Sequence, residues 1–378
     1  MSLMSPALVV VLVALVLAMV VGTILLWPRL APTRALTVLG RLGLLLGTNV
    51  AVLLLAFALL NDTFQFFSDW SDLIGTASTQ TTTAAGGGQA SGAVAVSVAP
   101  PAAVPVSTAT VLHHANGGVV YQVTGAVSGV SASVLVDLPQ GYGDPANSSR
   151  RYPVLVGMAG YPAPVTQLSS LYPVVATEQA LQQSHELGPV INVYPHAWTP
   201  SSRDTECVDG PDGAVPADRL ETWLTVDVPA WVRATFRANP QRSAWATWGE
   251  SAGGWCASMM TMLHPDTFSA AISLGGYFRP SWGNWVPYPP GDPALARYDL
   301  VDLAHRAPPP VALWLFAGRG DSYAFPSTDQ LIAAARPPLS VTAQIASSGG
   351  HRISEWKPWL PVALRWLGHN VSGFAPAP

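Results

Sequence analysis

One pentapeptide combines a serine with the small neighbours that a catalytic turn needs. Gly249-Glu250-Ser251-Ala252-Gly253 has the pattern Gly-x-Ser-x-Gly. Residues 244–248 before it are typical of a strand, and residues 254–263 after it are typical of a helix. In such a strand-turn-helix connection the serine hydroxyl is exposed above the sheet, and the flanking positions must be small. We therefore predict that Ser251 is a nucleophile; the alternative is an ordinary small-residue turn.

A serine hydroxyl is a weak nucleophile until a neighbouring base takes its proton. In this arrangement the acid and then the histidine follow the serine along the chain. His351 comes after the turn 347–350, which follows the apolar, strand-like run 339–345. We predict that His351 is the base. His264 ends the helix after the serine and is expected to be structural, and His369 lies near the C-terminus.

The acid is expected in the turn after the penultimate strand. Residues 311–316 are typical of that strand, and Asp321 lies in the turn that follows. We predict that Asp321 orients the histidine. A turn Asp can instead cap a helix or stabilise the turn itself. Asp329 and Glu355 are the alternative acids.

Two backbone N–H groups are needed to stabilise the oxyanion that forms when a serine attacks a carbonyl. One is expected from Ala252, the residue after the nucleophile. The other is expected from the loop after the strand-like run 153–157, where Tyr161 has an N–H and Pro162 has none. We predict that Ala252 and Tyr161 form the oxyanion hole.

Three aromatic residues lie in a proline-rich loop, residues 278–292, after an apolar strand-like run. They are Trp282, Trp285 and Tyr288. Such a loop can form the wall of an acyl pocket, or its aromatic residues can simply pack beneath it. Both interpretations stay open, and these residues are the candidate substrate-binding residues.

The elements around these residues alternate between strand and helix patterns. Short apolar runs bounded by helix breakers, at 132–138, 153–157, 189–194 and 268–274, indicate strands buried on both faces. Residues 219–237 have a helical apolar face with a kink expected at Pro229. The alternation predicts an α/β domain with a mostly parallel sheet, over residues 108–370, followed by a C-terminal tail, 371–378.

The N-terminal region has the composition of a membrane anchor, which we assign to residues 1–75. Uncharged apolar runs at 6–27 and 42–60 are long enough to cross a bilayer. Arg29, Arg34 and Arg41 lie between them, and positive charge beside a span stays in the cytoplasm. We therefore predict two transmembrane helices with both chain ends outside. A cleaved signal peptide is the alternative, but the first run has no basic residue before it.

The regions next to the anchor have distinct compositions. Aromatic residues that suit a membrane interface follow the second run: Phe64, Phe66, Phe67 and Trp70. Residues 76–107 are uncharged and almost all Thr, Ala, Gly, Ser, Val and Pro, which is typical of a flexible linker.

The chain has two cysteines, Cys207 and Cys256. An exported domain would meet an oxidising compartment, so we predict a disulfide between them; two buried thiols are the alternative. Acidic residues surround Cys207, namely Asp204, Glu206, Asp209 and Asp212. Their spacing does not match a calcium-binding loop, so a solvated loop is expected.

The overall charge excludes some functions. The formal net charge is −4, and nucleic-acid binding needs clustered Lys and Arg, so no nucleic-acid partner is expected. We expect no cofactor and no metal. The expected partners are the membrane and an acyl-ester or lipid substrate, for which a cell-envelope glycolipid is one candidate.

Several of these motifs, in this order, resemble the esterase D and antigen-85-type mycolyltransferase family over roughly residues 130–367. The resemblance is carried by Glu221-Thr222-Trp223-Leu224, Val228-Pro229-Ala230-Trp231, the Ser251 pentapeptide, His264-Pro265, Ser273-Leu274-Gly275-Gly276-Tyr277, and Gly350-His351 with Trp356 and Leu360. It implies an α/β-hydrolase fold, a serine-acid-histidine triad and acyl-ester chemistry. It matches Ser251 to the family nucleophile and His351 to the family base.

The chain departs from mycolyltransferases at three positions. Ala324 stands where they have a Glu, Pro162 replaces a basic residue of the oxyanion loop, and Ile353 replaces a Trp after the histidine. The leading hypothesis is therefore a membrane-anchored extracytoplasmic serine esterase. A cell-envelope acyltransferase and a non-catalytic binding protein on the same scaffold are the alternatives.

Overall fold

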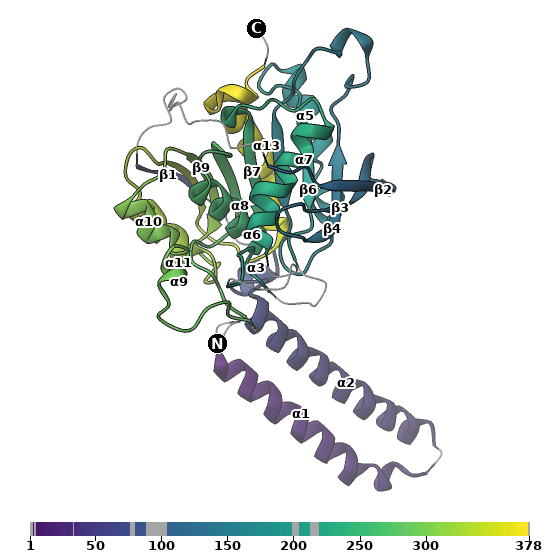
Figure 1. Ribbon diagram of the computed structural model, residues 1–378. Coiled ribbons are helices and arrows are strands. Elements are labelled where there is room, and N and C mark those ends of the chain that lie inside the picture. Colours follow the sequence, from purple (N-terminus) through teal and green to yellow (C-terminus); the bar gives the residue numbers. More distant parts are fainter. Residues whose placement is uncertain are drawn as a thin grey trace. The chain divides into compact units, whose positions relative to one another are not determined.

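A computed structural model describes residues 3, 5–32, 34–75, 80–87, 104–198, 204–211, 219–283 and 285–376 (Figure 1). The contacts within the chain divide it into two units, which we describe separately. The anchor unit comprises Met1–Gln80 with the loops Arg319–Ser322 and Ser347–Arg352. The sheet unit comprises Thr81–Gly318, Tyr323–Ala346 and Ile353–Pro378.

The sheet unit is built on one sheet that has ten strands in the described residues. Their order is β1-β10-β9-β8-β7-β5-β6-β4-β3-β2. The strands are β1 Thr81–Gly87, β2 Thr108–Ala115, β3 Gly118–Thr124, β4 Ser131–Asp137, β5 Val154–Met158, β6 Ile191–Pro195, β7 Trp245–Glu250, β8 Ala270–Leu274, β9 Ala312–Gly318 and β10 Ser340–Ala346. Strands β5 to β10 pair in parallel, whereas β1 at one edge and β4, β3 and β2 at the other pair antiparallel. The predicted mostly parallel sheet is confirmed.

Helices cover both faces of this sheet, which explains why its central strands are apolar on both sides (Figure 1). Alternate residues of β5 face opposite cores: Val154 and Val156 lie in one, and Leu155 lies in the other. The first face packs against α6 Leu220–Thr222, α7 Val228–Thr235, α8 Ala252–Leu263, α10 Leu300–Arg306 and α11 Phe325–Ala334. The second packs against α4 Gln167–Leu171, α5 Val174–Gln183, α12 Ile353–Trp356 and α13 Leu360–Asn370. A short helix, α9 Pro293–Ala296, lies in the connection between β8 and α10.

The predicted helix over residues 219–237 is interrupted. A π-helical turn, Trp223–Asp227, separates α6 from α7, and Pro229 lies in the first turn of α7. Proline lacks an N–H and is tolerated in a first helical turn. The backbone irregularity therefore falls just before the proline, near the expected kink.

Residues 81–87 differ from the flexible linker that the sequence suggested for 76–107. They form β1, which pairs with β10 from Thr81↔Ala346 to Gly87↔Ser340. The strand is threonine-rich and mostly exposed. Backbone hydrogen bonds hold such an edge strand without an apolar run, so its composition gave no strand signal. Residues 76–79 and 88–103 lie outside the described residues.

The anchor unit contains two long apolar helices, α1 Pro6–Leu26 and α2 Ala35–Phe64, followed by the short helix α3 Trp70–Leu73. Both long helices have the length and composition to cross a membrane. They pack side by side as a hairpin (Figure 1), with Thr23 Oγ1 3.3 Å from Thr48 Oγ1. The second helix is longer than the apolar run 42–60, and it includes Arg41 near its start.

Candidate active site

Ser251 occupies a sharp turn between β7 and α8. Its backbone angles, φ 53° and ψ −127°, lie in a region that L-residues rarely adopt. Its N–H donates to the carbonyl oxygen of Leu274 in the neighbouring strand β8, at 2.9 Å. Strain of this kind persists only when the surrounding structure fixes it, and it concentrates at functional sites. The predicted strand-turn-helix context of the serine is therefore present.

The two glycines that flank the turn are required by close backbone approach. A Cβ atom on Gly253 would lie 2.0 Å from the carbonyl oxygen of Met158, the last residue of β5. A Cβ atom on Gly249 would lie 2.3 Å from the carbonyl oxygen of Gly253. The small residues therefore serve both the turn itself and the packing of α8 against the end of β5.

The backbone around Ser251 provides candidate donors for an oxyanion. Ala252 is the first residue of α8, so its N–H has no partner within the helix. The loop after β5 passes beside the serine, because a Cβ atom on Gly160 would lie 3.3 Å from Ser251 Cβ and 3.8 Å from its Oγ. Tyr161 is the next residue of this loop, and its ring packs edge-on against Trp198. Ala252 is thus adjacent to Ser251 in the chain, and Tyr161 follows a residue that lies beside Ser251 in space.

Asp321 and His351 form a hydrogen-bonded pair in the anchor unit. His351 Nδ1 lies 2.8 Å from Asp321 Oδ2, and the Asp321 side chain is almost fully buried. Asp321 follows β9 and His351 follows β10. Strands β7, β9 and β10 run parallel, so Ser251, Asp321 and His351 all follow the carboxyl ends of strands at one edge of the sheet. This is the edge where ligands bind in α/β sheets.

The alternative acids do not share this position. Asp329 is exposed on α11, and Glu355 lies in α12. Ala324, at the position of the mycolyltransferase Glu, is buried at the start of α11. Of these candidate acids, Asp321 is the one whose Oδ2 lies 2.8 Å from His351 Nδ1.

His264 belongs to a different polar cluster, centred on Glu221. His264 Nε2 lies 2.7 Å from Glu221 Oε1, and the Tyr298 hydroxyl donates to Glu221 Oε2 at 2.6 Å. Burial alone would raise the pKa of Glu221, but the contacts with His264 and Arg297 outweigh it and hold the pKa below its usual value. The cluster ties α6 to the end of α8, which fits the structural role expected of His264.

The acidic stretch around Cys207 is not the solvated loop that its composition suggested. Glu206 is completely buried, and its carboxylate accepts from the Tyr277 hydroxyl at 2.8 Å. Burial raises the pKa of Glu206 well above its usual range. Its carbonyl oxygen accepts from Trp255 Nε1 in α8, at 2.8 Å. The sequence carried no signal for this burial, because the partners are remote along the chain; Asp212 lies outside the described residues.

The predicted disulfide between Cys207 and Cys256 is present, with a Cα–Cα distance of 5.7 Å. Cys256 follows Trp255 in α8, and Trp255 holds the residue before Cys207. The buried segment 206–207 is thus tied at two adjacent positions to the helix that begins after Ser251.

Reduction of this disulfide should lower the stability of the domain. The bond joins residues 49 apart, and a closed loop of that length stabilises the folded state by about 4 kcal/mol in the chain-entropy model. The thermal midpoint of the full chain in detergent, with and without reductant, measures the effect. Thiol titration of the denatured, unreduced protein is the control, and two free thiols per chain would contradict the bond.

A second buried carboxylate precedes the nucleophile. Glu250 accepts from the Tyr172 hydroxyl and from Gln167 Nε2, at 2.9 Å for the latter. Burial, together with the Glu250 carboxylate, raises the pKa of Tyr172 above its usual value. These bonds connect the end of β7 to α4 and its C-terminal cap. Sequence reasoning missed Glu250 because it occupies a variable position of the serine motif.

The three candidate substrate residues lie in the connection between β8 and α9. Trp282, Trp285 and Tyr288 are partly buried and pack against the core beneath this loop. The Tyr288 hydroxyl donates to the carbonyl oxygen of Asp209 at 3.2 Å. The buried part of each side chain therefore packs against the core, as one interpretation expected. A role of these residues in substrate binding stays a prediction.

A mostly parallel sheet covered on both faces, with a strained serine between a central strand and the next helix, defines the α/β-hydrolase class. Residues 126–367, more than half of the chain, match the family described as "Putative esterase". The chain belongs to this esterase family of serine hydrolases and acyltransferases.

The chain is also similar to individual proteins. An uncharacterised protein of Corynebacterium glutamicum is 29% identical over 147 residues, which cover 39% of this chain and 33% of that protein. The diacylglycerol acyltransferase/mycolyltransferase Ag85C of Mycobacterium avium is 27% identical over 121 residues, which cover 27% of this chain and 34% of that protein. The chain thus spans about a third of the length of these curated relatives. In the fold, it is similar to an S-formylglutathione hydrolase from Agrobacterium tumefaciens, with a TM-score of 0.54 at 17% identity, over 71% of this chain and 100% of that one.

Proposed function

We propose that this protein is a membrane-anchored serine esterase that acts on acyl esters outside the cytoplasm through an acyl-enzyme intermediate. Residues 1–75 are the anchor, and residues 108–370 are the catalytic domain. The proposal is supported above all by the strained turn at Ser251 together with the Asp321–His351 hydrogen bond. These are the parts that nucleophilic acyl transfer requires.

The reaction proceeds in two steps. Ser251 Oγ attacks the ester carbonyl while His351 takes its proton, and the N–H groups of Ala252 and Tyr161 bind the resulting oxyanion. The tetrahedral intermediate expels the alcohol, which receives the proton from His351, and the acyl group stays on Ser251. Water then repeats the sequence and releases the carboxylic acid. Asp321 holds the histidine in the tautomer that accepts a proton from serine.

Turnover and labelling of the purified full chain test this function. We expect hydrolysis of a short-chain nitrophenyl ester and covalent labelling by a fluorophosphonate, with the label on the peptide that contains Ser251. A label on another serine would contradict the assignment. Absence of both turnover and labelling would favour a non-catalytic binding protein on the same scaffold.

Acyl transfer to an alcohol is the second candidate function, because a relative is named as an acyltransferase. Addition of sugar or glycerol acceptors during ester turnover separates the two activities. Formation of a new ester at the expense of free acid supports a transferase, and unchanged acid release supports a hydrolase. In either case, Trp282, Trp285 and Tyr288 are our candidates for the wall that receives the acyl chain.

Protease added to intact cells, or to spheroplasts where a cell wall intervenes, should cleave within residues 76–107. The prediction rests on Arg29, Arg34 and Arg41, because positive charge between two spans favours a cytoplasmic connection between them. Because residues 76–107 contain no Lys or Arg, the protease must be one of broad specificity and not trypsin. Cleavage only after lysis would refute the proposed orientation.

A further inference from the structure

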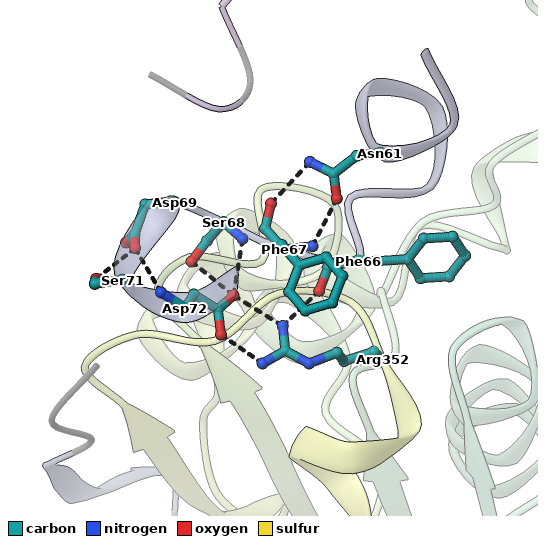
Figure 2. A network of polar contacts seen from close by, with 8 residues as sticks. All are labelled: Asn61, Phe66, Phe67, Ser68, Asp69, Ser71, Asp72 and Arg352. Carbon is teal, nitrogen blue, oxygen red and sulfur yellow. Dashed lines mark hydrogen bonds and ion pairs between the residues drawn. The ribbon is translucent and has the colours of Figure 1, made fainter. Parts of the chain in front are cut away.

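The segment that follows α2, residues 65–73, is an ordered structure of its own; we call it the junction segment. Gln65 ends α2 in a left-handed conformation, with φ 53°. The Asn61 side chain then holds Phe67 at both backbone groups, accepting from its N–H at 2.8 Å and donating to its carbonyl oxygen at 3.0 Å (Figure 2). Asp72 accepts from the Ser68 N–H at 2.9 Å. The chain therefore leaves the apolar helix in a fixed conformation.

The junction segment forms hydrogen bonds with the backbone of His351, the proposed catalytic base, and with the residue after it. The His351 N–H donates to the carbonyl oxygen of Gln65 at 2.8 Å, and Arg352 donates to the carbonyl oxygen of Phe66. The loop with the proposed acid is held at the same place, because the Ser322 hydroxyl donates to Gln65 Oε1 at 2.6 Å. Both loops belong to the anchor unit.

Close approach at two glycines shows that the junction segment fits these loops tightly. A Cβ atom on Gly350, the residue before His351, would lie 2.5 Å from the carbonyl oxygen of Phe66. A Cβ atom on Gly320, the residue before Asp321, would lie 2.5 Å from Ser68 Cβ. The sequence thus has a glycine immediately before each proposed partner of Ser251, where the junction segment leaves no room for a side chain.

An ion pair between Asp72 and Arg352 joins the junction segment to the loop that contains His351 (Figure 2). Both guanidinium terminal nitrogens donate to the carboxylate, Arg352 Nη1 at 2.8 Å from Asp72 Oδ2, and the Asp72 side chain is 5% exposed. Burial alone would raise the pKa of Asp72, but hydrogen bonds from Arg352 and Ser68 outweigh it and lower the pKa. The guanidinium also lies over the Phe67 ring, 4.7 Å from its centroid. Removing one partner of a buried pair leaves the other charge uncompensated, so the geometry depends on both.

We propose that the junction segment positions the catalytic base, and that Asp72 and Arg352 are positioning residues for the reaction. The inference rests on the proposed function, in which His351 serves Ser251. A catalytic side chain must be held to within about 0.5 Å of its productive place, and residues on loops need supporting contacts for that precision. The contacts made by the junction segment fall on the backbone of His351 and on the residues beside His351 and Asp321. In this proposal the junction segment contributes to the position of His351 and Asp321 in addition to ending α2.

A charge-reversal experiment on the full chain in detergent tests this role. The variants are Asp72→Asn, Arg352→Gln, the double variant of these two, and the reversed pair Asp72→Arg with Arg352→Asp. Each is measured for kcat and KM on a nitrophenyl ester, for the rate of fluorophosphonate labelling, and for thermal midpoint. Arg365→Gln is the control, because it removes an ion pair with Glu186 that lies within the sheet unit.

We expect each single variant to lower kcat and the labelling rate by about 10- to 100-fold, with KM within about twofold of wild type, as for a misplaced catalytic group. The double variant should lose less than the product of the two single losses, because both remove the same contact. The reversed pair should recover part of kcat, and Arg365→Gln should leave kcat unchanged.

Two results would overturn the positioning role. In one, wild type is active and the single variants have its kcat. In the other, their kcat falls only as far as their unfolded fraction at the assay temperature accounts for. Should Arg352→Gln fail to fold, Asp72→Asn decides alone, because it keeps the shape of the side chain and lies outside the catalytic loops. A wild-type chain with neither turnover nor labelling would instead overturn the proposed function, and the positioning role with it.

Discussion

Replacement of Ser251 by Ala should abolish fluorophosphonate labelling and reduce ester turnover by about 10⁴-fold or more, as in other enzymes that lose a triad member. Only the hydroxyl is removed, and its oxygen is the atom that forms the covalent bond in the proposed mechanism. The backbone strain at this turn, φ 53°, is held by the hydrogen bond to Leu274 and by the packing of Gly253, and neither involves the hydroxyl. The thermal midpoint should therefore change little.

Ser258 provides a matched control for this substitution. It lies in the same helix, fully buried, and its hydroxyl donates to the carbonyl oxygen of Gly254 at 2.9 Å. Ser258→Ala should leave labelling intact while lowering stability by about 1 kcal/mol, the usual contribution of one hydrogen bond. Labelling of the Ser251→Ala protein at wild-type rate would remove Ser251 from the mechanism.

Replacement of Asp321 by Asn should lower kcat by about 10⁴-fold while leaving KM nearly unchanged, which is the effect of this substitution in a serine-histidine-acid triad. The Asn side chain has the same shape but can present an N–H₂ donor to His351 Nδ1, which in the wild type lies 2.8 Å from a carboxylate oxygen. The imidazole then favours the tautomer that cannot accept the serine proton. Measurement of kcat and KM on a nitrophenyl ester checks this prediction.

The choice between candidate acids gives this prediction its control. Asp329→Asn changes an exposed carboxylate on the neighbouring helix α11 and should leave kcat within about twofold of wild type, as for most surface substitutions. If Asp329→Asn were as damaging as Asp321→Asn, or if Asp321→Asn had full activity, Asp321 would not be the acid.

Much of the sheet and the order of the candidate triad could be predicted from local patterns. The apolar runs at 153–157 and 268–274 became β5 and β8, because strands buried on both faces need continuous apolar sequence. The spacing of the glycines around Ser251 predicted the turn, because the steric limits that require small residues there are local.

What could not be predicted depends on contacts between distant parts of the chain. Strand β1 is a threonine-rich segment that becomes a strand only because β10 offers an unpaired edge. Glu206 was expected to be solvated because the residues that bury and bind it, Tyr277 and Trp255, are distant in the sequence. Likewise, Asp72 and Arg352 are 280 residues apart, and no local sequence pattern predicts an ion pair between them.

The hydrogen bond between the His351 N–H and the Gln65 carbonyl oxygen has a consequence for how the proposed enzyme would meet its substrate. Gln65 is the first residue beyond α2, so the backbone of His351 is hydrogen-bonded directly to the end of that helix. With α2 in a bilayer, as we propose, the base cannot swing into bulk solution on a tether. In that arrangement it would diffuse laterally with the membrane and stay at one depth. Encounter with an ester in the same leaflet would then be two-dimensional, and the rate would follow the mole fraction of that ester in the surface instead of its concentration in the volume.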